Sequence, residues 1–324
     1  MFYVSRFKDV EKREYECEVV TPLFLGGADP KEAELRAPPV KAAMRFWWRA
    51  LYEGGNVEQM AKDESAIFGS TEKKSVVSVQ LSADMAKTVP NDLPKGWPIP
   101  VEGKTFNAYI IEYLAFGLLD PKLKPKYIRK HIEEESRFKI IVTFPKHAED
   151  DVVSAMKSLI SFGGLGARSR NGFGSLHCDG LIDYAFSKEG GLKPFTAFSQ
   201  GAILFNQFNT YVKWEDALSE IGKVYRQARL DLEGKRHTWN KRALIAMPIE
   251  AQRENIPQSI RSGRHAKPYF LHVNKTDGKY RGQILFLPYL YKAAPNDTTN
   301  RFKEYMDACG KMNEVITKGM GGAK

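Results

Sequence analysis

The stretch that decides the fold runs from Arg137 to Phe162 and reads RFKIIVTFPKHAEDDVVSAMKSLISF. Over 137–144 apolar and polar residues alternate, and Pro145 ends the run, which predicts a strand. Over 149–162 apolar residues recur at helical spacing, acidic residues fill the first turn, and Gly163-Gly164 follows the last turn. The second run therefore predicts a helix.

Outward from this stretch, the first half of the chain carries similar signals. Residues 14–20 alternate and stop at Thr21-Pro22, and residues 75–81 are short and β-branched, so both predict strands. Pro38-Pro39 opens a helix over about 40–52, and residues 173–182 supply a fourth strand. The order strand, helix, strand, strand, helix, strand is that of the ferredoxin-like, or RRM-like, βαββαβ fold. We therefore predict such a domain over residues 1–185.

A long insertion separates the second and third strands of this predicted domain. It covers about 83–136, is rich in proline at first, and contains a predicted helix at 107–119. Insertions of this length are commonly functional lobes or partner-binding elements.

A second α+β domain is predicted after the linker 186–194. It covers 195–318 and reads as a diverged ferredoxin-like, basic domain with a flexible tail at 319–324. Its predicted strands are 202–205, 244–249, 269–273 and 283–291, and its predicted helices are 214–230 and 299–316. The fold class is therefore α+β, with tandem ferredoxin-like domains and an insertion in the first.

Composition excludes several classes of protein. The 324 residues are 43% hydrophobic, contain no apolar run of 18 residues, and begin without the apolar core of a secretory signal. Cys17, Cys178 and Cys309 are odd in number and far apart, which predicts neither a disulfide framework nor a cysteine zinc site. We expect a globular, cytoplasmic protein without membrane span, metal or cofactor.

The positive charge is concentrated in the second half of the chain. The net charge is +10, and from Pro194 onward 21 Lys and Arg face 12 Asp and Glu, a balance of +9. Such asymmetry favours a polyanionic partner, although a solvated basic surface is the alternative. The candidate contact residues inferred from this charge are Arg236, His237, Arg261, Arg264, His265 and Lys267.

The helix predicted near residue 40 carries a basic stripe. Lys41, Arg45 and Arg49 are spaced by four and share one face. We place Lys41 in the first turn, where the helix dipole disfavours a cation unless a phosphate docks there. Trp47 and Trp48 lie on or near the apolar face, and their alternative role is in the core.

A glycine-rich loop follows the helix at 149–162. Its glycines include Gly164, Gly166, Gly172 and Gly174, and they bracket Arg168 and Arg170. Glycine lets a ligand approach backbone N–H groups, and guanidinium groups suit phosphate. The loop is neither a Walker A loop nor a dinucleotide fingerprint, because its sequence and its place between helix and strand do not match. A tight turn with incidental arginines is the alternative.

These motifs resemble a known family. The pattern Gly164-Leu-Gly166, five residues, then Gly172-Phe-Gly174 resembles the glycine-rich loop of the RAMP superfamily of CRISPR-associated RNA-binding proteins. Within that superfamily, residues 21–29, 33–36 and 41–51 are similar to the first-numbered subunits of the type III-B effector, the Cmr complex. The resemblance covers 15–52 and 160–177.

The resemblance implies a tandem ferredoxin-like subunit near the 3′ end of the guide RNA. Such subunits contact guide and target single-stranded RNA and bind other Cmr-complex subunits, and they are not known as nucleases. The residues that match the family motifs are Lys41, Arg45, Trp47, Trp48, Arg49, Arg168 and Arg170.

Catalysis is the alternative to pure binding. His131, His147, His177 and His272 are scattered singletons, and the acidic runs fit solvated turns. His237 or His265, beside basic residues, could act as general acid or base in a metal-independent endoribonuclease that processes guide RNA. A nucleotide-binding regulatory enzyme that uses the glycine loop is the third hypothesis. The leading interpretation is a non-catalytic RNA-binding subunit.

Overall fold

A computed structural model describes most of the chain. The described residues are 9–29, 31–85, 88–89, 92–101, 105, 107–120, 122, 127–181, 189–233, 240–247, 265–292 and 301–320. The chain divides into two compact units. Unit 1 comprises 1–94, 114–186 and 272–277, and unit 2 comprises 95–113, 187–271 and 278–324. Relative to the predicted ranges, the segment 95–113 belongs to unit 2 and the segment 272–277 to unit 1.

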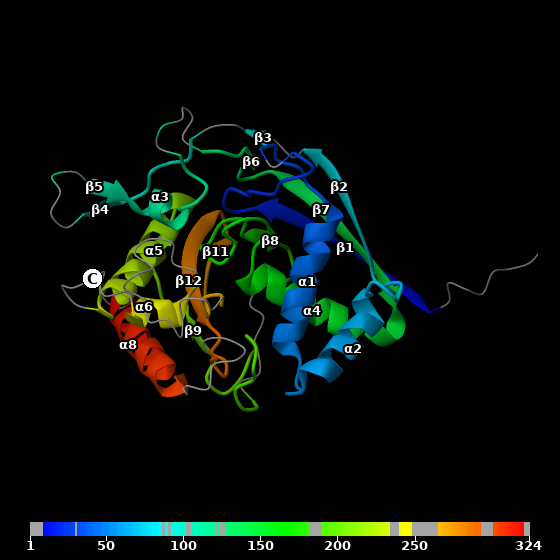
Figure 1. The fold of residues 1–324 in the computed structure, drawn as a ribbon. Helices are drawn as coiled ribbons and strands as arrows, with labels where there is room; N and C mark the ends of the chain where they lie inside the picture. The colour runs from blue at the N-terminus through cyan, green and yellow to red at the C-terminus, as the bar shows by residue number, and fades with distance from the viewer. Residues whose placement is uncertain are drawn as a thin grey trace, which may run out of the picture. The chain divides into compact units, whose positions relative to one another are not determined.

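Unit 1 is built on a four-stranded antiparallel sheet. Its strands are β1 (Val10–Val19), β2 (Ser78–Met85), β7 (Arg137–Pro145) and β8 (Leu176–Cys178), in the order β2-β7-β1-β8. Helices α1 (Ala37–Leu51) and α4 (Glu149–Phe162) pack on each other and on this sheet, side by side in Figure 1. These elements follow one another in the predicted order of strand, helix, strand, strand, helix, strand.

Alternation along β7 explains how the sheet and the helices share one core. Phe138, Ile140, Val142 and Phe144 are all buried, while the residues between them are less so. Because successive side chains of a strand point to opposite faces, these four line one face. The helix α4 buries most of its apolar residues, including Met156, as its spacing predicted, and Val153 is half-buried.

One helix of unit 1 was not predicted. Helix α2 (Val57–Phe68) begins after Asn56, whose side chain accepts hydrogen bonds from the backbone N–H groups of Glu58 and Gln59. Asparagine is a favoured N-cap because it satisfies helix N–H groups in this way. Helix α2 packs on α1 and carries the buried Glu64 toward it.

The insertion contains short elements rather than the predicted helix at 107–119. Strand β5 (Asn107–Tyr109) pairs with β4 (Pro98–Pro100), α3 covers only Ile110–Leu114, and β3 (Thr88–Val89) pairs with β6 (His131–Ile132). The prediction was wrong at both ends. Residues 107–109 pair with β4 as a strand instead of starting a helix. Gly117 has a φ of +88°, which is not a helical backbone conformation.

Unit 2 contains a smaller antiparallel sheet. Its elements in chain order are β9 (Ile203–Phe205), β10 (Thr210–Tyr211), α5 (Trp214–Leu230), α6 (Asn240–Ile245), β11 (Tyr269–Thr276), β12 (Lys279–Phe286) and α8 (Phe302–Met320), and residues 272–276 of β11 are grouped with unit 1. The sheet order is β10-β12-β11, and β9 also pairs with β12. Both Asp277 and Gly278 have positive φ, as a two-residue hairpin turn between β11 and β12 requires. Helices α5 and α8 pack together.

Three predictions for the second half need correction. Residues 244–245 lie in helix α6 instead of a strand, and 248–249 lie outside the described residues. Strand β12 ends at Phe286, earlier than predicted. The predicted flexible tail begins too early, because α8 continues through Met320 with Ile316 buried, while 321–324 lie outside the described residues.

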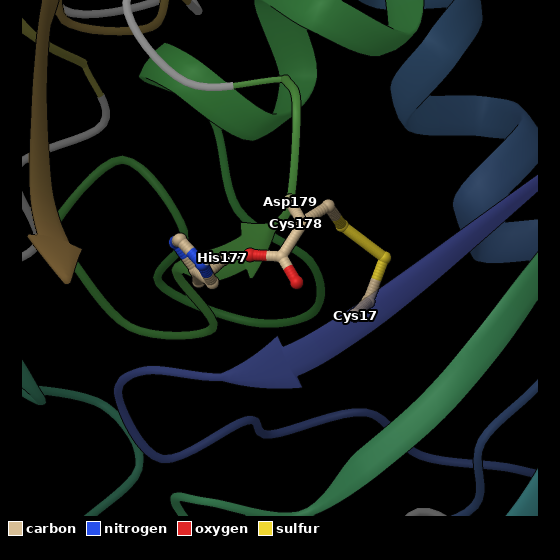
Figure 2. The surroundings of a disulfide bond; sticks show 4 residues. All are labelled: Cys17, His177, Cys178 and Asp179. Atoms are coloured by element: carbon tan, nitrogen blue, oxygen red, sulfur yellow. Dashed lines mark hydrogen bonds and ion pairs between the residues drawn. A yellow bond between two sulfur atoms is a disulfide. The ribbon is translucent and has the colours of Figure 1, made fainter. Parts of the chain in front are cut away.

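The prediction of no disulfide was also wrong. Cys17 of β1 and Cys178 of β8 form a disulfide bond, which Figure 2 shows between the two strands. They are direct partners in the antiparallel register, with Cα atoms 4.5 Å apart. The two cysteines are 161 residues apart in sequence, so the bond could not be predicted from their spacing. Only the sheet topology makes them neighbours. Cys309 is a buried free thiol in α8.

Candidate nucleic-acid interface

The two sequence motifs meet in unit 1. The guanidinium of Arg170, in the glycine-rich loop, lies over the ring of Phe46 on α1, 5.1 Å from its centroid. Gly163, at the end of α4, lies so close to the indole of Trp47 that a Cβ there would clash. The motifs at 41–51 and 163–174 are therefore in direct contact with each other.

The glycine-rich loop packs tightly on the segment that follows β1. The N–H of Ala167 donates to the Phe24 carbonyl at 2.8 Å, and the N–H of Gly174 donates to the Pro22 carbonyl at 3.0 Å. The buried hydroxyl of Thr21 donates to the Gly172 carbonyl at 2.7 Å. These bonds hold the loop in a fixed shape.

Two glycines of the loop make this close packing possible. Gly166 and Gly174 have φ of +79° and +66°, in the left-handed region that favours glycine. A Cβ on Gly166 would clash with the Phe24 carbonyl, and one on Gly174 with the Leu165 carbonyl. Glycine is therefore required here by the protein's own backbone.

The sequence predicts that a phosphate could approach the N–H groups of the glycine-rich loop. Many of them already donate to acceptors inside the protein, namely those of Leu165, Ala167, Asn171, Gly172, Gly174 and Ser175. A group that is already paired cannot also bind a phosphate without losing its bond. The arginine side chains of the loop are the other candidate groups for a ligand.

Arg168 is the most accessible of these arginines. It is exposed, and it has φ of +62°, which is uncommon for a residue with a side chain. Its guanidinium lies against Gly117, in the turn after α3, where a Cβ would clash with it. Desolvation by these surroundings lowers the pKa of Arg168. Arg168 therefore holds a defined position on the surface.

The basic stripe on α1 is largely paired inside the protein. Glu64 of α2, only 6% exposed, accepts hydrogen bonds from Arg45 Nε at 2.5 Å and from Arg49 at 2.6 Å. Lys41 donates to the Val77 carbonyl at 2.9 Å, and burial followed by the charge of Arg45 lowers the pKa of Lys41. The stripe therefore joins α1 to α2 and to Val77, the residue before β2.

The helix start also differs from the prediction. Helix α1 begins at Ala37, so Lys41 lies beyond the first turn. The argument that a misplaced lysine needs a phosphate therefore fails, because the dipole acts mainly within the first turn.

Trp47 and Trp48 are core residues. They are 2% and 5% exposed, so neither ring presents a face on which a base could stack. The indole N–H of Trp48 donates to Asp151 of α4 at 2.6 Å, and Trp47 packs on Phe162. The alternative role in the core is the one that the structure supports for both.

The predicted cluster in the second half is only partly described. Arg236, His237, Arg261 and Arg264 lie outside the described residues. Nε2 of His265 lies 3.2 Å from the Leu244 carbonyl, and its ring meets Tyr291 edge to face. Burial lowers the pKa of His265. The ammonium of Lys267 lies 4.3 Å from the ring centroid of Tyr225.

Unit 2 contains a basic cavity that the sequence analysis missed. Its volume is about 400 Å³, and Arg226, Arg229 and Arg242 line it. Arg229 donates to the Tyr113 hydroxyl at 2.9 Å, and Arg242 lies 3.2 Å from the carboxylate of Glu233. The spacing of Arg226 and Arg229 on one helix face was the available signal.

None of the described helices is long and apolar enough to cross a membrane. No three His, Cys, Asp or Glu side chains gather into a candidate metal site within the described ranges.

Sequence comparison relates the chain to one family. The family model of the RAMP superfamily matches residues 16–177. The CRISPR system Cmr subunit Cmr1-2 of Pyrococcus furiosus is 34% identical over 178 residues, which cover 50% of this chain and 92% of that relative. Subunit Cmr1-1 of the same organism is 29% identical over 168 residues, 50% of this chain and 46% of that one.

Solved structures share the fold. Apo Cmr1 from Pyrococcus furiosus superposes with a TM-score of 0.57 at 17% identity, over 94% of this chain and 96% of that one. A chain of the type III-B Cmr-beta complex bound to cognate target RNA gives 0.52 at 11% identity, over 95% and 100%. The matched range 16–177 contains α1, α4 and the glycine-rich loop, so this chain belongs to the RAMP superfamily.

Proposed function

We propose that this chain is a non-catalytic RNA-binding subunit of a type III-B CRISPR effector complex. It contacts guide and target RNA near the 3′ end of the guide and binds neighbouring Cmr subunits. The observation that carries the proposal is the exposed Arg168, fixed on a rigid glycine-rich loop within the region that matches the RAMP superfamily. The similarity to Cmr1 subunits supports the assignment to this kind of complex.

The chemistry of Arg168 suits a phosphate. A guanidinium offers fork-shaped donors that match phosphate oxygens, and it stays charged at neutral pH. Desolvation lowers the pKa of Arg168, and no acidic side chain among the described residues forms a salt bridge with it. A non-glycine residue with left-handed backbone costs about 1 kcal/mol or more, and such strain is commonly retained at functional sites.

Arg170 adds a second cation in the same loop. Its contact with Phe46 orients the guanidinium over α1 and leaves the residue half-buried. Two guanidinium groups two residues apart are suited to a ribose-phosphate strand, which carries one charge per nucleotide. Arg168 and Arg170 together are the core of the proposed interface.

We also propose that the two units are tandem ferredoxin-like domains. In unit 1 the sheet order β2-β7-β1-β8 with α1 and α4 supports this. In unit 2, two short strands that both pair with β12, namely β9 and β10, precede α5, and β11, β12 and α8 follow, which matches the first five elements of the βαββαβ order apart from the short α6. Residues 1–185 and 195–318 remain our proposed domain ranges, although 95–113 belong to unit 2 and 272–277 to unit 1.

The endoribonuclease hypothesis gains no support from the described residues. Nε2 of His265 faces a backbone carbonyl, and its lowered pKa disfavours the protonated form that a general acid needs. The nucleotide-enzyme hypothesis needs free loop amides, and many of these are already bonded. We therefore retain RNA binding without catalysis.

Photo-crosslinking tests the proposal directly. The full chain is mixed with a short single-stranded RNA that contains 4-thiouridine, irradiated, digested and analysed by mass spectrometry. We expect adducts on peptides that contain Arg168 or Arg170, and fewer of them in Arg168→Ala. Arg281→Ala, an exposed arginine of unit 2, serves as the charge-matched control. Adducts that avoid residues 163–174 would contradict the proposed site.

A further inference from the structure

Phe116 is an exposed aromatic residue beside the glycine-rich loop. Phe116 is 76% exposed, and no other aromatic residue in the described ranges is exposed to a similar extent. Burying a phenylalanine side chain stabilises the folded protein by on the order of 2–3 kcal/mol. The exposed ring of Phe116 does not contribute this free energy to folding. An exposed aromatic ring of this kind is a candidate for ligand contact.

Two contacts fix the turn that carries Phe116 to the loop that carries Arg168. The side-chain amide of Asn171 donates to the Leu114 carbonyl at 2.6 Å. The guanidinium of Arg168 occupies the space beside Gly117, the residue next to Phe116. The turn that carries the exposed ring and the loop that carries the exposed cation therefore lie next to each other in unit 1.

We propose that Phe116 is a stacking platform for an RNA base and that Arg168 binds the phosphate beside that base. The inference rests on the proposed function and deepens it, because it names a contact that the sequence could not identify. Aromatic rings stack on bases of any identity, while arginine binds the backbone. The pair would bind single-stranded RNA with little sequence preference.

The cation beside the turn favours an RNA base over a protein partner. A protein contact needs an apolar patch of several hundred Å². The neighbours of Phe116 in sequence, the buried Ala115 and the exposed Gly117, add no apolar side chain to the surface, and Ile128, whose N–H donates to the Leu118 carbonyl, adds one that is 37% exposed. The close cation, Arg168, complements a polyanion.

The test is equilibrium binding of a fluorescein-labelled single-stranded RNA to the full chain, followed by anisotropy at several salt concentrations. Phe116→Ala should weaken binding between about 5-fold and 150-fold, which corresponds to loss of one stacked base. The slope of log affinity against log salt should stay unchanged, because no charge is lost. Phe116→Tyr should bind like the wild type, and Phe116→Leu should not.

Two controls sharpen the result. Val212→Ala removes an equally exposed apolar side chain, also at 76%, from unit 2, and should leave affinity unchanged. An abasic oligonucleotide of the same length should bind the wild type and Phe116→Ala equally, because it has no base to stack.

Wild-type affinity in Phe116→Ala or Phe116→Leu would overturn the inference. If the wild type binds RNA and Arg168→Ala weakens it while Phe116→Ala does not, only the stacking role fails. If the wild type binds no RNA at all, the proposed function fails as well.

Discussion

Arg45 Nε donates a hydrogen bond of 2.5 Å to a carboxylate oxygen of Glu64, a residue that is only 6% exposed. The same oxygen accepts a bond from Arg49. A buried carboxylate depends on such partners, because an unpaired charge in the protein interior is costly. The stripe that the sequence presents as a ligand surface therefore works first as a connection between α1 and α2.

Replacing Glu64 by Gln should destabilise unit 1. The variant leaves two half-exposed arginines without their anionic partner, so we expect a loss of about 1–2 kcal/mol, which allows for solvent screening. Thermal unfolding followed by circular dichroism measures this loss. Glu53→Gln, an exposed carboxylate of the same unit, should change stability by less than about 0.5 kcal/mol. Equal effects of the two variants would contradict the assigned role of Glu64.

Gly174→Ala should be much more destabilising than Gly180→Ala. Both glycines have positive φ, but only at Gly174 would a Cβ meet backbone, whereas nothing lies within 4 Å at Gly180. We expect about 1 kcal/mol at Gly180 from backbone strain alone and about 3 kcal/mol or more at Gly174. The difference in melting temperature between the two variants measures the packing contribution. Equal losses would show that the loop does not pack as described.

Reduction of the Cys17–Cys178 disulfide should lower the melting temperature. A cross-link between residues 161 apart restricts the unfolded chain strongly, and we expect it to contribute about 2–5 kcal/mol. Calorimetry with and without a phosphine reductant measures the shift. The double variant Cys17→Ser, Cys178→Ser should not respond to the reductant. Labelling of three thiols in denatured, unreduced protein would exclude the bond.

Stability should fall as the pH drops from about 6.5 to about 4. His272 is fully buried, its Nδ1 lies 2.6 Å from the Gly163 carbonyl, and burial lowers its pKa to about 4. Above pH 6.5 the histidine is neutral in both states, and below it the unfolded chain binds the proton first, so unfolding becomes easier. The expected loss is about 2 kcal/mol at pH 5.

His272→Asn should reduce this pH dependence, as urea unfolding at pH 7 and pH 5 would measure. Burial also lowers the pKa of His131 to about 4, so part of the acid sensitivity should remain. The exposed His147 provides the matched control His147→Asn, which should keep the wild-type dependence. An unchanged dependence in His272→Asn would contradict the assigned burial of a neutral ring.

Periodicity predicted the long elements because each has one buried face. Helices α4 and α5 begin and end at the predicted residues, since their apolar spacing continues to both ends. The helix predicted at 107–119 failed because local propensity there yields to pairing of β5 with β4. The Cys17–Cys178 bond depends on long-range register, which no spacing in the sequence reveals.

The candidate site was predictable in part. Arg168 and Arg170 were found because glycines bracket them, and this signal is local. The pairing of Arg45 with Glu64 was not predicted, because the sequence analysis did not identify α2, the helix that carries Glu64. Phe116 carries no motif, and its exposure becomes apparent only from the turn after α3.

The most direct test of the central claim is the salt dependence of single-stranded RNA binding by the wild type and by Arg168→Ala, Arg170→Ala. If each arginine binds one phosphate, the double variant should bind more weakly, and its slope of log affinity against log salt should be smaller by about 1.4. Arg281→Ala should keep the wild-type slope and affinity. An unchanged slope and affinity in the double variant would contradict RNA binding at the glycine-rich loop.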